Sequence, residues 1–532
     1  MQITKRTSPS KQQPQSAISS LVKKEDLVRL MLQSLIDLGY NEAAECLQRE
    51  SGFTLESDLI VRLRTYILGG QWQLAEDLLP NIPFTNVENL STVQFLIRQQ
   101  KFLELLEEGE AMQALHVLRT EITPLGENTQ RLHLLTSLVL CSSIEDVMEQ
   151  ASWDGTKRPN STSRQQLLND IQHYVDPTAM IPKQRLFQLI HQAVEYQKRS
   201  CLYHNPTDDC DISLFSDHLC DKALFPTKTI KILTGHTDEI WHVAYSHDGK
   251  HLASVSKDKT CIIWDMDTFE KVQSFVNEES GSYCSWSPDD TKLLICGIDF
   301  AIRLWDPFLG ILLQTFAFHK DQVTSCAWLP DSEHFISGAC EKILCLWHCQ
   351  QSHVQPVTQW PVQRTTDMKI TADGSRLVTI GMDKCINVYD LEDLQLTEIA
   401  RLEEEGTITS LTLTKNGRYA LVNVQELQEL HLWDLETRQI VHKYAGQKQL
   451  TFIIRSTLGG RNDSFVISGS EDNRVYIWSR EHETLLEELE GHENTVNCIS
   501  WRPIEPIQFV SASDDQTIRV WGSPQHTIAS SQ

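Results

Sequence analysis

Long apolar runs are missing from this sequence of 532 residues. A helix that crosses a bilayer needs roughly 18 to 20 consecutive apolar residues, and no stretch of the chain approaches that length. The first residues, MQITKRTSPSKQQPQSAISS, also lack the apolar segment of a secretory signal. We therefore expect a protein of the cytoplasm and nucleus that has no membrane as a partner.

Positive charge is scarce as well. The chain has 47 Lys and Arg residues against 72 Asp and Glu residues, which gives a net charge of −25. A molecule of this charge repels a phosphate backbone, so nucleic acid is excluded as a partner. The 14 cysteines are scattered along the chain, a pattern that favours reduced thiols inside the cell over a disulfide framework.

Motifs for catalysis are absent too. The sequence contains neither a Gly-rich phosphate loop nor a Cys/His series with the spacing of a RING domain. It also offers no convincing pair of nucleophile and base. The sequence therefore predicts no enzymatic activity, no catalytic residue and no cofactor.

From Gly235 onward the chain is repetitive. Seven units each end in an apolar pair followed by an aromatic residue, and the aromatics are spaced by 41, 42, 42, 44, 45 and 43 residues. They are Trp264, Trp305, Trp347, Tyr389, Trp433, Trp478 and Trp521. This period, with a polar turn at the centre of each unit, is typical of the four-stranded blade of a β-propeller. We predict seven blades over residues 225–522.

Polar residues recur at fixed places within these units. An Asp precedes the closing aromatic by six residues in five units, Glu341 takes that place in the third unit and Leu427 in the fifth. The pairs Gly235-His236 and Gly491-His492 open the first and last units, and His319 has the matching place in the third. Together these residues resemble WD40 repeats. The fifth blade departs most from the pattern, and we expect it to be the loosest.

The WD40 resemblance implies a hydrogen-bonded set of His, Ser, Asp and Trp inside a blade. The matching residues are His236, Ser254, Asp258 and Trp264 in the first blade, and His492, Ser511, Asp515 and Trp521 in the last. A hydrolase would also use Ser, His and Asp. Because the trio recurs at blade spacing beside a Trp, we interpret it as structural, satisfying polar groups buried between sheets.

The ends of the repeat region predict how the ring closes. After Trp521 the tail GSPQHTIASSQ is too polar to form an outer strand, whereas residues 229–233 alternate well just before the first Gly-His pair. We expect this early strand to complete the last blade, so that no open edge is left.

The front of the chain has helical periodicity instead. In DLVRLMLQSLIDLGYNEAAECLQRESG, apolar residues recur on one face of a first helix that ends at Gly39. A second helix is expected to be capped by Asn41 and to end at Gly52. Two helices this short cannot bury their apolar faces alone, so we expect the hairpin to pair with a copy of itself or a related chain. Packing on later helices of the same chain is the alternative.

Motifs in this half resemble two known helical domains. Leu38-Gly39-Tyr40, Ala43-Ala44 and Glu50-Ser51-Gly52 resemble the LisH motif, a dimerising hairpin. The resemblance implies an oligomerisation surface of Leu27, Leu30, Met31, Leu35, Leu38, Tyr40 and Leu47. The ordered segments Phe95 to Gln99, Leu105 to Gly109 and Ala114 to Arg119 resemble a CTLH domain.

The expected architecture is thus multidomain, with an all-α LisH and CTLH region followed by an all-β, seven-bladed WD40 propeller. We divide the chain into a disordered tail (1–20), a LisH hairpin (21–54), a CTLH domain (55–122), a further helical region and linker (123–224), the propeller (225–522) and a flexible tail (523–532).

Two cysteine clusters invite a test for metal ligands. Zinc prefers thiolate and imidazole ligands, and the segment before the propeller carries Cys201, His204, Cys210, His218 and Cys220. Their spacing matches no site known to us, and the Asp-rich residues between them favour turns. Cys340, Cys345 and Cys349 of the third blade are better explained as small buried residues. We therefore predict no metal site.

The whole chain resembles the propeller subunits of the GID/CTLH ubiquitin ligase. The resemblance rests on LQRESG, on LRTEITPLGENTQRLHLL, on CLYHN with SDHLC, and on GSEDNRVYIWSREHETLLEELEGHENTVNCISWRP. It implies a non-catalytic scaffold that assembles with LisH-CTLH and RING subunits, forms a homodimer or higher oligomer, and supports proteasome-dependent degradation.

The propeller would then recruit protein substrates or regulators through one rim. Candidate rim contacts are Lys257, Lys320, Arg364, Met382 and Glu471. Two alternatives stay open: a splicing-associated scaffold of the same layout, and an adaptor that binds G-protein subunits or kinases outside any ligase.

Overall fold

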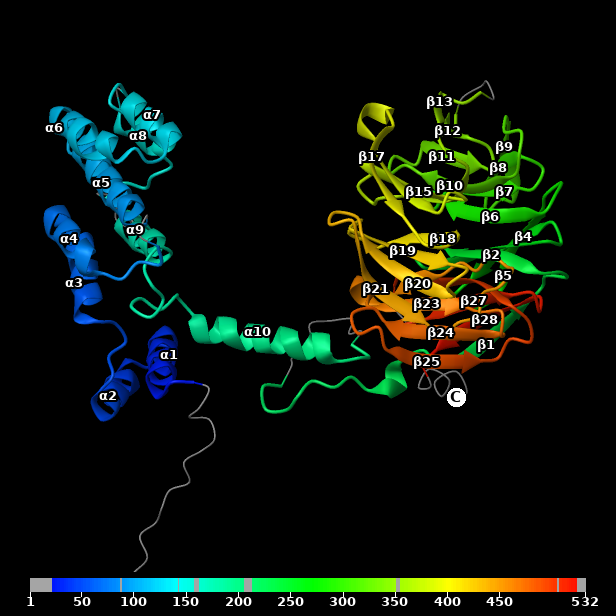
Figure 1. The fold of residues 1–532 in the computed structure, drawn as a ribbon, viewed down its shortest axis with the longest axis horizontal. Helices are drawn as coiled ribbons and strands as arrows, with labels where there is room; N and C mark the ends of the chain where they lie inside the picture. Colours follow the sequence, from blue (N-terminus) through cyan, green and yellow to red (C-terminus); the bar gives the residue numbers. More distant parts are fainter. Residues whose placement is uncertain are drawn as a thin grey trace, which may run out of the picture. The chain divides into compact units, whose positions relative to one another are not determined.

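The computed structural model describes residues 22–86, 89–141, 143–156, 162–204, 213–350, 355–504 and 507–523. These residues form two compact units, one up to Ala193 and one from Val194 onward. Figure 1 shows the first unit as helices and the second as a ring of sheets. Both expected tails lie outside the described residues, apart from Ser523. In the described part of the chain, no helix combines the length and apolarity needed to cross a membrane.

The first unit opens with a helical hairpin of α1 (Lys24–Asp37) and α2 (Asn41–Ser51). The turn passes through Gly39 at φ 87°, where the Tyr40 N–H donates to the Leu35 carbonyl. Tyr40 therefore occupies the cap position and Asn41 is already helical, so the expected capping role of Asn41 is wrong. As expected, α2 ends at Gly52, whose left-handed backbone is easy for a residue without Cβ.

Further helices follow: α3 (Asp58–Leu68), α4 (Trp72–Leu78), α5 (Asn89–Glu107), α6 (Ala111–Val117), α7 (Thr129–Leu138), α8 (Ile144–Ala151), α9 (Ser163–Gln172) and α10 (Arg185–Ser200). One core joins apolar residues of α3, α4 and α5 to Leu168 and Ile171 of α9. A second joins α5 and α6 to α7 and α8. Packing thus continues across residue 122, where the sequence suggested a domain boundary.

The second unit contains seven four-stranded antiparallel sheets. The first three are β2 (Ile240–Tyr245), β3 (His251–Ser256), β4 (Thr260–Asp265) and β5 (Lys271–Val276); β6 (Gly281–Trp286), β7 (Leu293–Gly297), β8 (Ala301–Asp306) and β9 (Ile311–Ala317); and β10 (Val323–Trp328), β11 (His334–Ala339), β12 (Ile343–His348) and β13 (Thr358–Pro361). This arrangement confirms the predicted fold class.

The next three sheets are β14 (Thr365–Ile370), β15 (Arg376–Gly381), β16 (Cys385–Asp390) and β17 (Thr397–Glu403); β18 (Ile408–Leu413), β19 (Tyr419–Val424), β20 (Glu429–Asp434) and β21 (Gln439–Ala445); and β22 (Thr457–Gly459), β23 (Phe465–Gly469), β24 (Arg474–Ser479) and β25 (Leu485–Glu490). Within a blade the second strand is buried on both faces, as in β7, because neighbouring blades pack against it. The fourth strand, as in β9, is mostly exposed.

The seventh sheet closes the ring. It combines β26 (Val496–Trp501), β27 (Phe509–Ser513) and β28 (Thr517–Gly522) with β1 (Lys228–Thr234) from the front of the propeller. The strands β1 and β28 are antiparallel, and Leu233 lies opposite Ile518. Leu233 is buried in the core between the last and first blades. The predicted closure by the early strand is confirmed.

Two neighbouring residues of β1 allow a matched test of this closure. Leu233 is 3% exposed and Ile232 is 41% exposed. Leu233→Ala should lower the free energy of unfolding of the propeller by about 2–4 kcal/mol, because it leaves a cavity in the closing blade. Ile232→Ala should cost less than about 1 kcal/mol, since its side chain faces solvent. Denaturant unfolding of both variants would check this, and equal losses would contradict the assigned register.

Candidate interaction surfaces

Buried polar sets lie inside the first and last blades, and they consist of the residues that the WD40 resemblance indicated. In the first blade, the His236 ring approaches Asp258 (Nδ1 to Oδ2, 3.0 Å) and Ser254 (Nε2 to Oγ, 2.8 Å). Trp264 donates its indole N–H to the same Ser254 oxygen at 2.9 Å. In the last blade the corresponding distances are 2.7, 2.7 and 2.8 Å.

The surroundings of these sets suit a structural role. Ser254 and Ser511 are 0% exposed, so neither hydroxyl is open to a substrate. Burial lowers the pKa of His236 even though Asp258 lies beside it. Burial alone would raise the pKa of the Asp515 carboxyl, but the hydrogen bond and charge of His492 lower it below its ordinary value. Each carboxylate satisfies buried donors and fixes a turn.

Two other blades satisfy the same need with different residues. In the third, Glu341 takes the place of Asp, and His319 lies 2.6 Å from it and 2.7 Å from Ser337. The fifth blade has Leu427 there instead, at 37% exposure. The polar set of the fifth blade instead uses an acidic residue from the segment before its first strand, which the sequence did not predict.

Glu404 supplies the missing acceptor of the fifth blade. Its Oε1 lies 2.9 Å from His431 Nδ1 and accepts the indole N–H of Trp433 at 2.5 Å. Burial opposes charge on this pair, yet the hydrogen bonds from His431 and Trp433 lower the pKa of Glu404. The hydrogen bonds of His431 to Glu404 and Glu429 raise the pKa of His431 against the effect of burial. A buried, hydrogen-bonded pair of Glu404 and His431 thus replaces the usual set.

The LisH hairpin has one closed side and one open side. Val28, Leu32 and Ala44 are buried, with Leu35 and Leu47 packed against them. Four other apolar residues from the expected oligomerisation surface are exposed by 37% to 61%, and we call them the LisH stripe. They are Leu27, Met31, Leu38 and Tyr40. Leu30 is half-buried.

Polar contacts tie the closed side of the hairpin to its own chain. Arg29 donates to the Leu55 carbonyl (Nε, 3.1 Å) and to the Thr178 carbonyl (Nη1, 2.6 Å). Gln33 donates to the Pro182 carbonyl at 2.8 Å. The alternative of packing on the same chain therefore holds for this side. The LisH stripe remains exposed in the single chain.

The five rim candidates all lie in loops at one end of the strands. Loops between the second and third strands and loops between blades reach the same face, because the strands of each blade alternate in direction. Lys257 forms an ion pair with Glu239 at 3.0 Å. Met382 is 62% exposed, and Lys320 and Arg364 are also exposed. The fifth candidate, Glu471, is bonded to the backbone of a neighbouring loop.

Glu471 shapes a loop that the sequence analysis missed. Its Oε1 accepts the backbone N–H groups of residues 450, 451 and 452 at 2.7, 2.8 and 2.9 Å. The loop exposes Leu450 by 64%, Phe452 by 51% and Ile453 by 57%. We call these three residues the rim loop. The apolar run LTFII, directly after the polar GQKQ, is the sequence signal that could have revealed them.

A cavity of about 230 Å³ lies among the innermost strands. Its charged groups have partners inside the ring: Arg455 Nη1 is 2.7 Å from Asp367 Oδ2, and Lys369 donates to the Tyr283 hydroxyl at 2.5 Å. Burial raises the pKa of Tyr283 to about 12. Since Tyr283, Asp367 and Arg455 come from the second, fourth and sixth blades, these contacts link blades across the ring.

The two cysteine clusters differ in the structure. Cys201, His204, His218 and Cys220 converge, with one ligand atom of each within 4.8 Å of all the others. Cys210 lies outside the described residues. Cys345 and Cys349 are buried in an apolar core of the second and third blades, as small core residues would be.

The acidic residues at matching places in the sixth and seventh blades provide a matched test of the polar set. Asp515 accepts from the His492 ring, from Thr517 and from the Glu493 N–H. Asp515→Ala should lower the free energy of unfolding by about 2–4 kcal/mol, because several buried donors lose their acceptor. Asp472, whose partner is the Tyr476 hydroxyl, should cost less when replaced by Ala. Thermal and denaturant unfolding would rank the two variants, and the opposite ranking would contradict this account.

Comparisons with known families cover both units. Residues 16–57 match the WDR26 Lis-homology domain, and residues 60–184 match the TPR1-like, CTLH-containing domain. The WD domain, G-beta repeat, matches residues 227–265, 270–306, 310–348, 450–479 and 483–522. The fourth and fifth blades lie outside these matches, in line with the unusual polar set of the fifth blade.

Several relatives align with this chain over both of its units. A WD repeat-containing protein 26 homolog of Arabidopsis thaliana is 37% identical over 509 residues, which cover 94% of this chain and 85% of the relative. The Drosophila melanogaster homolog is 35% identical, covering 94% and 80%. GID complex subunit 7 of Schizosaccharomyces pombe is 36% identical, covering 94% and 97%. The chain therefore belongs to the family of WD repeat-containing protein 26 homologues.

Proposed function

We propose that this protein is a non-catalytic scaffold of a RING-type GID/CTLH ubiquitin ligase, and that it recruits protein substrates or regulators for proteasome-dependent degradation. The observation that carries the proposal is the similarity to GID complex subunit 7, which extends over 97% of that subunit. Because the match includes the helical unit as well as the propeller, it supports a shared mode of assembly and not only a shared fold.

Assembly would depend on the LisH stripe. Apolar area removed from water stabilises an interface by roughly 25 cal/mol per Å², so an exposed row of Leu, Met and Tyr favours contact with another apolar helix. The closed side of the hairpin is already occupied by Leu55 and the segment around Thr178. The stripe is thus the surface that a second copy or a related LisH-CTLH subunit would cover.

Recruitment would use the rim of the propeller. The segment that carries the rim loop is held by three backbone N–H bonds to Glu471. Gln425 Nε2 also donates to the Leu450 carbonyl at 2.7 Å, and Gln449 Nε2 donates to the Phe452 carbonyl at 2.8 Å. A loop fixed in this way exposes its apolar side chains at a small entropic cost of binding. Exposed Lys320 and Arg364 on the same face would suit an acidic ligand segment.

Catalysis would be left to other subunits. The Ser hydroxyls of the Ser-His-Asp sets are buried and hydrogen-bonded to the His rings. Arg455 and Asp367 of the central cavity bind each other. All of these groups thus have structural partners. We propose that the protein works in the cytoplasm and nucleus. The alternatives, a splicing-associated scaffold and a G-protein or kinase adaptor, have only weaker support: relatives such as the serine-threonine kinase receptor-associated protein of Gallus gallus are 22% identical over 54% of this chain.

Association through the LisH stripe can be tested with matched substitutions. Met31 and Ile36 are exposed by 43% and 44%, but they are five positions apart, which places them about 140° from each other around α1. Leu27→Asp with Met31→Asp should convert an oligomer to a monomer, since charge in an apolar interface is costly. Ile36→Asp should leave the oligomer intact.

Light scattering would measure the mass of each variant, and circular dichroism would show that the helices persist. An unchanged mass for the double variant would remove the stripe as the association surface. Monomers from both variants would indicate that the stripe has no special role.

Recruitment through the rim loop can be tested in a reconstituted ligase. Replacing Leu450, Phe452 and Ile453 by Ser should reduce ubiquitin transfer at least about tenfold toward proteins whose abundance rises when this chain is deleted, since an apolar hot spot is lost. The control replaces Ile311, Leu312 and Leu313 of β9, which are exposed by 53%, 42% and 51%.

Three outcomes separate the proposals. Loss of transfer for the rim-loop variant alone supports recruitment through this face. Unchanged transfer when the whole protein is omitted would overturn the ligase proposal. Capture of spliceosomal proteins, or of G-protein subunits and kinases, in place of RING and LisH-CTLH subunits would favour the corresponding alternative.

A further inference from the structure

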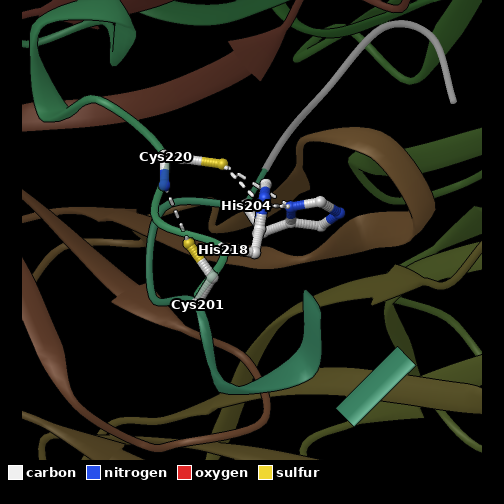
Figure 2. Close-up of side chains that lie close together, drawn as sticks. All are labelled: Cys201, His204, His218 and Cys220. Atoms are coloured by element: carbon white, nitrogen blue, oxygen red, sulfur yellow. Dashed lines mark hydrogen bonds between the residues drawn. The ribbon is translucent and has the colours of Figure 1, made fainter. Parts of the chain in front are cut away.

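Two short segments between the helical unit and the propeller bring four soft ligands together. Cys201 and His204 directly follow α10, and His218 and Cys220 directly precede the 3-10 turn Lys222–Leu224. Residues 205–212 between them lie outside the described residues. Figure 2 shows the two thiols and two imidazoles gathered around one point.

The distances among these side chains are close to the edges of a small tetrahedron. His204 Nδ1 is 2.8 Å from His218 Nε2, and Cys220 Sγ is 3.5 and 3.2 Å from these two nitrogens. All four ligand atoms lie within 4.8 Å of one another. A tetrahedral zinc ion with ordinary bond lengths separates neighbouring nitrogen and sulfur ligands by about 3.3–3.8 Å. To hold the ion, the 2.8 Å nitrogen contact would open by about 0.5 Å, and a pair at the 4.8 Å limit would close by about 1 Å.

We propose that Cys201, His204, His218 and Cys220 bind one structural zinc ion. The set supplies two thiolates and two neutral imidazoles, a usual combination for structural zinc. Four protein ligands fill a tetrahedral ion completely, so no position is left for a water nucleophile. The site would stabilise the fold and would carry no chemistry. The spacing of these residues in the sequence predicted no metal site; the folded segments bring the ligands together regardless of that spacing.

Hydrogen bonds around the cluster support the assignment. The backbone N–H of Cys220 donates to Cys201 Sγ at 3.3 Å, a contact that stabilises a thiolate. Gln197 on α10 accepts the backbone N–H of His218 at 3.3 Å and donates to Asp217 at 3.2 Å. Such outer contacts orient metal ligands in proteins.

The position of the cluster indicates what the ion would do. Tyr203 donates to Glu487 of β25 at 2.8 Å and packs edge-on against Phe225 at 5.3 Å. Lys222 forms an ion pair with the same Glu487 at 2.5 Å. The ligands thus flank residues that are anchored on the sixth blade. A zinc ion would join the two ends of the connector there and hold in place the segment that leads into β1.

Metal content of the intact chain is the direct test. Protein purified in reducing buffer without added metal should contain about one zinc ion per chain by plasma mass spectrometry. His204→Ala with Cys220→Ser should lower that content at least about fivefold, because two of four ligands are lost. Cys340→Ser, which removes a partly exposed thiol of the third blade, should leave it unchanged.

Wild-type protein keeps the test decisive even if the ligand variant folds poorly. A zinc content well below one ion per chain in the wild type would overturn the proposal, as would a Cys201–Cys220 disulfide in non-reduced peptide maps. Exchange into cobalt(II) should give the intense visible spectrum of a tetrahedral thiolate site. A weak, octahedral spectrum would overturn the proposal.

Removal of the ion should also have a local effect. A strong chelator should increase protease cleavage between residues 201 and 225 in the wild type and in Cys340→Ser, because the connector loses its cross-link. Unchanged cleavage after the zinc has demonstrably left would overturn the structural role. Both readouts are independent of ubiquitin transfer, so the zinc proposal and the ligase proposal can fail separately.

Discussion

Pairing of β1 with β28 is the constraint on which the ring depends. Each blade buries both faces of its inner strands against its neighbours, so an incomplete last blade would expose core residues such as Ile518 as well as an open strand edge. The contact joins residues about 290 positions apart in the chain, as between Thr229 and Arg519. The ring is therefore completed only when its two ends meet, and the same strand fixes where the connector leaves the propeller.

Within the closed ring, each blade must satisfy polar groups that burial removes from water. Four blades show three solutions: Asp with His and Ser in the first and last, Glu341 in the third, and the Glu404–His431 pair in the fifth. The centre adds the Asp367–Arg455 contact across blades. Since these groups serve one another, they support the proposal that recognition uses the exposed loops of the rim and the helical unit.

The helical unit shows the limits of periodicity. Apolar spacing predicted one apolar face on α1, but the structure divides those residues between a closed side around Leu32 and the exposed LisH stripe. Which side closes depends on Arg29 and Gln33, whose partners lie near residues 55 and 178–185. Spacing along one helix carries no information about such distant partners.

The sequence by itself determined the seven blades, the closing strand, the helix breaks and the absence of catalytic motifs, because these depend on residues that are neighbours in the chain or recur at a fixed period. Tertiary structure alone decided that Glu404 serves the fifth blade, that Glu471 holds the rim loop, and that Cys201 and His204 meet His218 and Cys220. Each of these contacts joins residues from separate segments, and only the folded backbone brings such segments within bonding distance.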